Sequence, residues 1–576
     1  MRTIIKYLKP YIRKMLLAAL LITASTLCDL MLPTLMSGIL NTGIPQGDQA
    51  VILRACLQML LLAGVSLGCV IWGSKISSKV VAAFCADVRA DVFRKVNTLS
   101  FDAFGKLGTA ALVTRATHDV ETLSWVASML SGTVATIPIL FLGGVLLALR
   151  KDVVLSLVML AFIPFILLAV ILIGRKVVPL WINSDKYIDR QNAILRERLR
   201  GIRVIRAFLA EPREHKRLAD ATNIMADNII RGNTSMGIIE PLSMLLLNLA
   251  VLVIVYLGGW RMVHRVSAVS AGDIYVIIQY VTLAINGVLM GSFAIVMLPH
   301  AQVAAGRINE VLGATGVDDD TGGREAALTG GIELDDVSFS YGGSENAVDH
   351  VSLRILPGQR VSVIGGTGSG KSTLISLLLG FRAPTGGTIR FDGIPAEQLS
   401  RRCLRGSISC VLQGASVYSG TIGENIRMGN AEADEADEAD VWQAVDIAQL
   451  RGFVDECPGG LDYEVKQAGK NLSGGQKQRL SIARALVRKT PIYIFDDSFS
   501  ALDFLTEKKL RAALNEKIQG RTQLVVTQRI TSAMSADCIF VMDRGRLVGA
   551  GTHDELLAHC GIYQEIYASQ TGGGAK

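Results

Sequence analysis

One stretch of the chain combines the residue types and the spacing of a phosphate-binding loop. It fits the pattern G-x-x-x-x-G-K-[ST] and runs through Gly365, Gly366, Thr367, Gly368, Ser369, Gly370, Lys371, Ser372 and Thr373. Its glycines let backbone N–H groups turn inward and form a nest for anionic oxygens. Lys371 can reach the β- and γ-phosphates of a nucleotide, and the Ser372 hydroxyl can hold Mg²⁺. The stretch therefore predicts a nucleotide-binding site.

The segments on either side of this loop are those that would position it. Residues 360–364 are mostly apolar and predict a short strand, and residues 372–380 predict a helix. The N-terminus of that helix would direct its positive end toward the phosphates. A glycine-rich turn with a chance lysine is the alternative, and the strand and helix make it the poorer interpretation.

The composition of the whole chain indicates a membrane protein. Of its 576 residues 50% are hydrophobic and only 19% are charged, and the apolar residues concentrate before about residue 299. The net charge of +7 comes from Lys and Arg that cluster between the apolar runs, which favours a membrane over a nucleic-acid partner. The nine cysteines show no C-x-x-C spacing, so we expect reduced thiols and neither zinc nor disulfides.

Six apolar runs are each long enough to cross a lipid bilayer as a helix. They cover residues 15–40, 51–73, 126–149, 153–174, 238–260 and 274–298. The basic segments between the second and third runs, and between the fourth and fifth, should be cytoplasmic. Both segments are too long for turns, so we expect the membrane helices to continue into the cytosol. They would bend back around residues 102–119 and 197–211, where a cytosolic domain could bind.

A single acidic residue interrupts the first apolar run. Asp29 lies in its middle, close to Pro33. A charge at that depth is costly, so we expect either a water-lined cavity on a substrate pathway or a structural ion pair.

The chain divides into two predicted domains. Residues 1–312 form the membrane domain, residues 313–331 are a linker rich in Gly, Asp and Thr, and residues 332–576 form the nucleotide-binding domain. Residues 332–341 alternate like a strand. Tyr341 ends this stretch, where its ring could stack on an adenine or pack in the core.

Further motifs extend the pattern through the second domain. Gln413 stands in Val411-Leu412-Gln413, a signature reads Leu472-Ser473-Gly474-Gly475-Gln476, an acidic strand ends in Asp496-Asp497, and a turn reads Ser500-Ala501-Leu502-Asp503. With these motifs and residues 201–208 the chain resembles, over its full length, a half-transporter of the ABC exporter type (type IV, multidrug-type). The resemblance implies a multi-domain membrane protein. Its six-helix, all-α transmembrane domain with long cytoplasmic helix extensions would precede an α/β P-loop ABC ATPase domain with a helical subdomain.

Each motif also has chemistry of its own. Asp496 can hold Mg²⁺ beside the phosphate loop together with Ser372, and the amide oxygen of Gln413 can contact Mg²⁺ or the attacking water. Ser473, Gly474, Gly475 and Gln476 stand at the start of a predicted helix, where a hydroxyl and free N–H groups suit a γ-phosphate. The resemblance implies two ATPase domains that meet head to tail, with each ATP held between one chain's phosphate loop and the other's signature.

Two positions depart from the family's pattern. The family has a glutamate after the magnesium aspartate and a histidine after the last core strand, and this chain has Asp497 and Gln528 there. The carboxylate of Asp497 would fall about 1–1.5 Å short of the lytic water, a misplacement that can cost about 10²-fold in rate. Gln528 can donate a hydrogen bond to a γ-phosphate but cannot shuttle a proton. Both changes together predict a site that binds ATP tightly and hydrolyses it poorly.

We therefore expect ATP-driven export of amphipathic small molecules by a heterodimer with a second, homologous ABC half-transporter. Asp497, Gln528 and Gln413 are the candidate catalytic residues, and this chain's signature would complete the partner's active site. We expect an integral protein of a bacterial plasma membrane, with the N-terminus and the ATPase domain cytoplasmic. The alternatives are a homodimeric lipid or peptide exporter in which Asp497 is a slow base, and an ATP-gated regulatory or channel protein.

Overall fold

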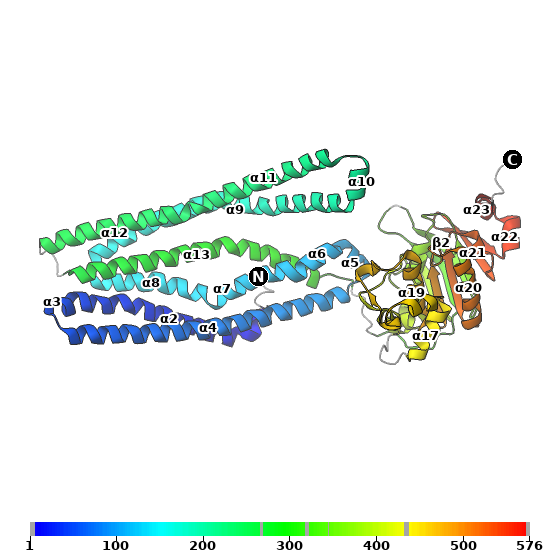
Figure 1. Ribbon diagram of the computed structural model, residues 1–576, viewed down its shortest axis with the longest axis horizontal. Coiled ribbons are helices and arrows are strands. Elements are labelled where there is room, and N and C mark those ends of the chain that lie inside the picture. Colours follow the sequence, from blue (N-terminus) through cyan, green and yellow to red (C-terminus); the bar gives the residue numbers. More distant parts are fainter. Residues whose placement is uncertain (1–5, 265–268, 317–321, 344, 431–436, 572–576) are drawn as a thin grey trace. The chain divides into compact units, whose positions relative to one another are not determined.

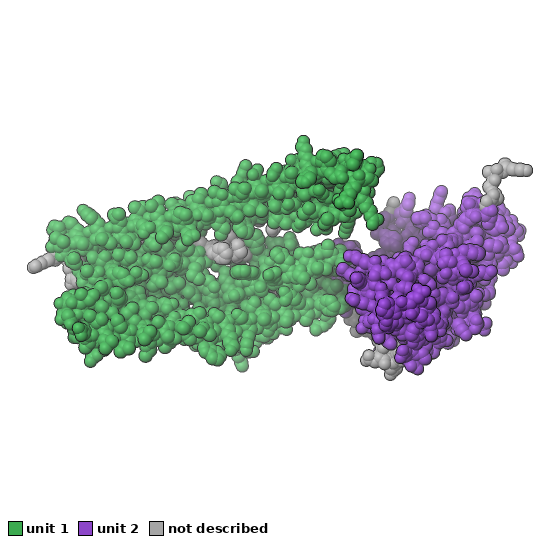
Figure 2. Space-filling view, in the orientation of Figure 1, with its two compact units in different colours: residues 1–97, 107–314 green, residues 98–106, 315–576 purple. Residues whose placement is uncertain are grey.

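The computed structural model describes residues 6–264, 269–316, 322–343, 345–430 and 437–571. They form two compact units, coloured separately in Figure 2. The first contains Met1–Asn97 and Leu107–Ala314, and the second contains Thr98–Lys106 and Thr315–Lys576. The short segment Thr98–Lys106 thus packs with the C-terminal unit although the chain on both sides of it belongs to the N-terminal one.

The first unit is built of helices, most of which are long (Figure 1). They are α2 (Ile12–Gly38), α3 (Ile44–Gln46), α4 (Gln49–Asn97), α6 (Thr109–Thr114), α7 (Val120–Ser131), α8 (Thr133–Lys151), α9 (Val153–Arg200), α10 (Ile202–Ala207), α11 (Glu211–Gly237), α12 (Ile239–Val263) and α13 (Ala271–Leu312). Within the described residues, six continuous helical stretches are long and apolar enough to span a membrane. The predicted six-helix membrane domain is confirmed.

Helix length confirms the predicted extensions beyond the bilayer. Helix α4 has 49 residues and α9 has 48. At 1.5 Å per residue each is more than about 70 Å long, against a hydrocarbon core of about 30 Å. Helix α10 lies at the turn between α9 and α11, within the second predicted bend.

Small residues let the membrane helices approach closely. A Cβ atom at Gly144 of α8 would lie 3.0 Å from the Tyr280 carbonyl oxygen of α13, and one at Gly287 would lie 3.2 Å from the Ile137 carbonyl oxygen. Lipid gives helices no hydrophobic reason to associate, so close packing through such residues holds the bundle together. At the ends of these helices, Lys151 pairs with Asp273 at 3.0 Å and Arg261 with Asp152 at 2.6 Å.

The second unit contains three sheets. Its strands are β1 (Ile332–Phe339), β2 (Val348–Ile355), β3 (Arg360–Ile364), β4 (Gly386–Phe391), β5 (Ile394–Pro395), β6 (Ile408–Val411), β7 (Gly420–Thr421), β8 (Glu464–Val465), β9 (Ile492–Asp496), β10 (Thr522–Thr527), β11 (Cys538–Asp543) and β12 (Arg546–Gly551). The main sheet has the order β12-β11-β3-β10-β9-β6, and all its pairs except β11 with β12 are parallel. A four-stranded antiparallel sheet has the order β2-β1-β4-β5, and β7 pairs with β8.

Helices complete this unit. They are α5 (Phe101–Leu107, whose last residue falls in the first unit), α14 (Lys371–Leu378), α15 (Arg401–Gly406), α16 (Ile422–Arg427), α17 (Glu438–Ile447), α18 (Arg451–Glu456), α19 (Gly474–Leu486), α20 (Phe504–Lys517), α21 (Ile530–Ala533), α22 (His553–His559) and α23 (Gly561–Thr571). Buried residues of α16 to α20, such as Ile426, Val445 and Leu480, share one apolar core with Phe495 of β9. This arrangement is the predicted α/β ATPase fold with its helical subdomain.

Candidate nucleotide site

Four adjacent parallel strands carry the phosphate loop, Gln413, the Asp496–Asp497 pair and Gln528 at the same edge of the main sheet. The phosphate loop follows β3, Gln528 follows β10, Asp496 ends β9 with Asp497 next to it, and Gln413 follows β6. Because the carboxyl ends of parallel strands meet at one edge, residues far apart in sequence come together there.

A cavity of about 340 Å³ opens at this edge. It is lined by Tyr341, Ala347, Thr367, Gly368, Ser369, Gly370, Lys371, Ser372, Thr373, Gln413, Asp496, Asp497, Val526, Thr527 and Gln528. Most of the predicted phosphate-loop, metal and catalytic positions therefore face one space. Gly365 and Gly366 lie outside this lining, and so do Ser473, Gly474, Gly475 and Gln476.

Two glycines of the loop are required by close approach of the backbone. A Cβ atom at Gly365 would lie 2.2 Å from the Met542 carbonyl oxygen, and one at Gly370 would lie 2.3 Å from the Ala347 carbonyl oxygen. Gly370 also has a φ of +96°, which favours glycine, and it is the N-cap residue of α14. The loop therefore delivers the N-terminus of α14 to the cavity.

Lys371 lies buried within the loop. Its Nζ donates hydrogen bonds to the carbonyl oxygens of Gly365 at 2.8 Å and Gly366 at 2.6 Å, and to the Ser369 hydroxyl at 3.0 Å. Burial lowers the pKa of Lys371, and the carboxylates of Asp496 and Asp497 act in the opposite direction. Lys371 and both aspartates line the same cavity, so a positive and two negative groups border the space that phosphates would fill.

Asp496 is 5% exposed at the end of β9. Burial raises the pKa of its carboxyl and the neighbouring Asp497 adds to this, whereas hydrogen bonds from Ser372 and the Gln413 backbone act in the opposite direction. A hydroxyl, a carboxylate and an amide oxygen are hard oxygen ligands that suit Mg²⁺. Among the described residues no three His, Cys, Asp or Glu side chains converge as a metal-binding group. The residues present fit a magnesium ion shared with a nucleotide.

Asp497 is held in a left-handed backbone conformation. Its φ is +47°, and its N–H donates to the Val526 carbonyl oxygen of β10 at 2.8 Å. The carbonyl oxygen of Asp497 accepts a hydrogen bond from the Ser500 hydroxyl at 2.9 Å. A non-glycine residue in this conformation is strained, so the surrounding bonds fix where its short side chain begins.

Gln528 is exposed, and its backbone carbonyl group is hydrogen-bonded to helix α23. Gln570 of α23 donates from Nε2 to the Gln528 carbonyl oxygen at 2.7 Å and accepts at Oε1 from the Ile530 N–H at 2.8 Å. The next residue, Arg529, donates to the Ser500 carbonyl oxygen at 2.9 Å and to Glu507 at 3.2 Å. The segment after β10 is therefore tied both to α23 and to the turn that follows Asp497.

Tyr341 stands at the rim of the cavity, 60% exposed. Its hydroxyl shares a 3.0 Å hydrogen bond with that of Thr373. The core-packing alternative for this ring is disfavoured by its exposure, and an exposed face is what stacking on a base requires.

The signature residues form a helix start elsewhere on the unit. Ser473 caps α19, with its hydroxyl accepting from the Gln476 N–H at 3.3 Å and Gln476 Oε1 accepting from the Ser473 N–H at 2.7 Å. The helix begins at Gly474, within the predicted signature stretch. This capping box leaves Ser473 at the helix N-terminus but outside the phosphate-loop cavity.

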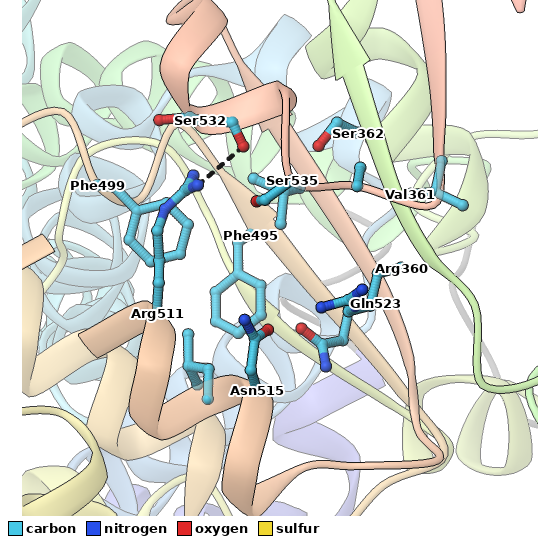
Figure 3. A pocket seen from close by; sticks show the side chains of 13 residues that line it. Arg360, Val361, Ser362, Phe495, Phe499, Arg511, Asn515, Gln523, Ser532 and Ser535 are labelled. Carbon is cyan, nitrogen blue, oxygen red and sulfur yellow. Dashed lines mark hydrogen bonds between the residues drawn. The ribbon is translucent and has the colours of Figure 1, made fainter. Parts of the chain in front are cut away.

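A smaller cavity, shown in Figure 3, lies toward the opposite edge of the same sheet. It is lined by residues at or near the starts of β3 and β10, such as Arg360 and Gln523, and by Arg511, which donates to the Ser532 carbonyl oxygen at 2.9 Å. Its volume is about 40 Å³, close to the roughly 30 Å³ that one water occupies in the liquid. It is too small for a nucleotide.

Sequence reasoning missed several residues of this site. Ala347, Val526 and Thr527 line the cavity, and Arg529 and Gln570 hold the segment around Gln528. The position of Arg529 beside Gln528 is a local signal that could have been used. Gln570 is 42 residues from Gln528, and nothing in its own neighbourhood marks it.

Comparison with known proteins finds relatives along the whole chain. Residues 15–288 match the family described as ABC transporter transmembrane region, and residues 348–500 match the family described as ABC transporter. An uncharacterized ABC transporter ATP-binding protein of Mycobacterium tuberculosis is 34% identical over 98% of this chain and 97% of its own length. The ATP-dependent lipid A-core flippase of Pseudomonas fluorescens is 32% identical over 98% of this chain and 95% of its own. The structure of a bacterial Atm1-family ABC exporter with ATP bound has a TM-score of 0.82 over 99% of both chains at 23% identity, which is a likeness of fold.

Proposed function

The chain belongs to the ABC transporter family, and we propose that it is one half of a heterodimeric exporter whose own ATP site hydrolyses poorly. In this proposal its phosphate loop holds ATP, while Ser473 to Gln476 complete the active site on the partner subunit. Family membership and the six apolar helical stretches of the described residues identify the protein as an integral membrane, ATPase-coupled transporter with the ABC exporter fold.

One observation carries the heterodimer proposal: Asp497 and Gln528 line the same cavity as Lys371 and Asp496. The side chain of Asp497 is one methylene shorter than that of glutamate. Because the Asp497 N–H is hydrogen-bonded to Val526 of β10, the backbone cannot shift to bring the carboxylate closer to the attacking water. An uncharged amide at the other wall cannot accept or return a proton. The signature keeps a hydroxyl and free N–H groups at the start of α19. In this proposal Asp497 and Gln528 impair this chain's own ATP site, whereas the unimpaired start of α19 serves the partner's ATP site.

The proposed mechanism is alternating access. Mg²⁺, held by Ser372, Asp496 and phosphate oxygens, would offset the negative charge at this site. Lys371 would exchange its bonds to the loop carbonyls for bonds to the nucleotide, and Gln413 would report the occupied site toward the membrane domain. Two ATP-bound ATPase domains would close on one another and turn the membrane cavity outward, and hydrolysis at the partner's site would reopen it.

An intramembrane carboxylate supports an amphipathic substrate. Asp29 accepts a hydrogen bond from the Ser66 hydroxyl at 2.9 Å, and Ser66 shares another with Ser25 at 2.8 Å. Both serines are buried between α2 and α4, yet Asp29 itself is exposed. Among the described residues no cation pairs with Asp29. Lys151 and Arg261, at the ends of neighbouring helices, are already paired with other aspartates.

The direction of Asp29 can be worked out from the helix period. The exposed apolar stripe of α2 contains Leu20, Leu27 and Met31. Asp29 is two residues from both Leu27 and Met31, which places it about 200° away on the opposite face. Asp29 is thus exposed on the same side of α2 as the buried Ser25, away from the apolar stripe. We infer that its carboxylate borders an interior space of the bundle and not lipid. We propose that this carboxylate receives the cationic end of an amphipathic substrate.

A homodimeric lipid exporter is the second candidate. It is favoured by the flippase name of the Pseudomonas relative and needs Asp497 to act as a slow base.

ATPase turnover by the full-length chain purified alone separates the two candidates. The heterodimer proposal expects turnover near background, rising at least about 10²-fold when the partner half is co-purified, because the hydrolytic machinery is then complete. Robust turnover by the chain alone would overturn it and leave the homodimer.

A further inference from the structure

An arginine outside the phosphate loop connects the wall of the nucleotide cavity to helix α5. Arg382 stands in the loop between α14 and β4, and its side chain is 18% exposed. Its guanidinium group lies over the ring of Tyr341, 4.5 Å from the centroid, and over that of Phe339 at 5.6 Å. The same group forms an ion pair with Asp102 of α5. One side chain thus contacts both the candidate base-stacking ring and the segment that returns to the membrane unit.

The neighbouring residues hold this connection in place. Phe381 stacks on Phe101 of α5, with ring centroids 4.4 Å apart and planes at 27°. Arg405 lies over Phe381 at 5.2 Å and donates to the carbonyl oxygens of Leu379 and Gly380 at 3.3 and 3.2 Å. The turn that carries Arg382 is therefore braced from the ATPase core on one side and from α5 on the other.

Tyr341 lines two cavities. One is the phosphate-loop cavity, and the other is a space of about 540 Å³ lined also by Phe101, Asp102, Lys106 and Arg382. The Tyr341 hydroxyl is hydrogen-bonded to Thr373 of α14. The Tyr341 ring packs edge to face against Phe339, with centroids 5.0 Å apart and planes at 87°. A base stacked on this ring would restrain it further, and the guanidinium group resting on the ring would be restrained with it.

We propose that Arg382 is a positioning residue through which occupancy of the base site sets the docking of α5, by way of Tyr341, Arg382 and Asp102. This rests on the proposed stacking role of Tyr341. Coupling between two sites is reciprocal, so docking of α5 through Asp102 must raise ATP affinity by the factor by which ATP strengthens that docking. Arginine suits this position because its flat guanidinium group can stack on a ring while its N–H groups pair with a carboxylate, whereas a lysine ammonium is a point charge without a flat face.

A double-mutant cycle tests the link, with ATP affinity of the full-length chain in nanodiscs as the readout. Asp102→Ala and Arg382→Ala should each weaken ATP binding about fivefold, at the lower end of usual coupling factors. Asp102→Ala should have no further effect once Arg382 is alanine, because Asp102 acts through it. Arg382→Lys, which keeps the charge but not the stack, should recover only part of the affinity.

Asp537→Ala is the matched control. Asp537 forms a partly exposed ion pair with Arg360 at 2.7 Å, beside the small cavity of Figure 3, and lines neither of the two larger cavities. The Asp537→Ala variant should leave ATP affinity unchanged.

Additive effects of Asp102→Ala and Arg382→Ala on ATP affinity, or no effect of either, would overturn the link. Tyr341→Ala distinguishes the two proposals: if it weakens ATP binding and Arg382→Ala does not, only the link fails. If Tyr341→Ala leaves ATP binding unchanged, the stacking role fails and the link with it.

Discussion

Two regions of the C-terminal unit handle ATP in this family, and they differ in how far this chain preserves them. The phosphate-loop cavity is lined by Lys371 and Asp496, which suit nucleotide and Mg²⁺ binding. It is also lined by Asp497 and Gln528, at the two positions where the resemblance to ABC exporters implies a glutamate and a histidine. The start of α19 keeps a capping serine and two glycines. Binding needs a cradle and charge, whereas hydrolysis also needs a base within reach of a water. This difference between the two regions is the basis of our proposal that the chain binds ATP at its own site but hydrolyses it poorly there.

The largest predicted effect separates these two regions directly. Ser473→Arg places a bulky cation at the N-terminus of α19 and should lower ATPase activity of the assembled transporter by about 10²-fold or more, because the partner's site loses its donors. Lys371→Ala, at this chain's own loop, should lower it by only about tenfold. Equal losses from the two variants, measured as steady-state phosphate release, would remove the asymmetry.

The second prediction attempts to repair the cavity. Asp497→Glu combined with Gln528→His should raise hydrolysis at this chain's own site by about tenfold or more, since it restores the reach of the carboxylate and a group that can carry a proton. The readout is single-turnover hydrolysis of bound ATP. Asp503→Glu is the matched control, because it also lengthens a carboxylate by one methylene but at the N-cap of α20, outside the cavity lining, and it should give no gain. Failure of the repaired variant to hydrolyse faster would show that these two residues are not the cause.

The third prediction asks whether the substrate site is independent of this asymmetry. Asp29→Asn should weaken binding of the permanent cation tetraphenylphosphonium about fivefold, the effect of losing roughly 1 kcal/mol of charge pairing. The ratio between the Ser473→Arg and Lys371→Ala effects should stay unchanged.

Asp48→Asn is the control for that measurement. Asp48 accepts hydrogen bonds from the first turn of α4 at 2.9 and 3.2 Å, a role that asparagine fills equally well. Equal cation affinity of the Asp29→Asn variant and the unchanged chain would refute the substrate role of Asp29 and leave the ATP-site comparison standing.

The smallest predicted effect concerns the clamp on Gln528. Gln570→Ala removes two hydrogen bonds and should cost about 1–2 kcal/mol in stability of the ATPase unit, with less than about a threefold change in activity. Thermal unfolding measures the first and phosphate release the second. Gln564→Ala, which loses a 2.7 Å bond to the Leu557 carbonyl oxygen within the same helical region, is the control for a bond that does not reach Gln528.

Much of the fold could be predicted because local patterns determine it. The apolar runs predicted six spanning helices, and the alternation and glycine spacing predicted β3, the loop and α14 in their correct order. The gathering of the phosphate loop, Gln413, Asp496, Asp497 and Gln528 in one cavity could be predicted because each ends or follows a parallel strand, and parallel strands bring such positions to one edge.

The remaining features depend on contacts between distant residues. The left-handed conformation of Asp497 comes from its bond to β10, and no local signal marks it. Gln570 and Asp102 act on residues 42 and 280 positions away, and each looks like an ordinary polar helix residue in the sequence. The pairing of Asp29 with Ser66 likewise required knowing which face of α4 meets α2.

The most direct measurement of the central claim identifies the nucleotide that each phosphate loop of the assembled, working transporter holds. A photoreactive ATP analogue labelled on the α-phosphate can be crosslinked during turnover, and the label recovered from each chain analysed as di- or triphosphate. We predict triphosphate on this chain and diphosphate on a different partner chain. Diphosphate on two copies of this same chain would contradict the account.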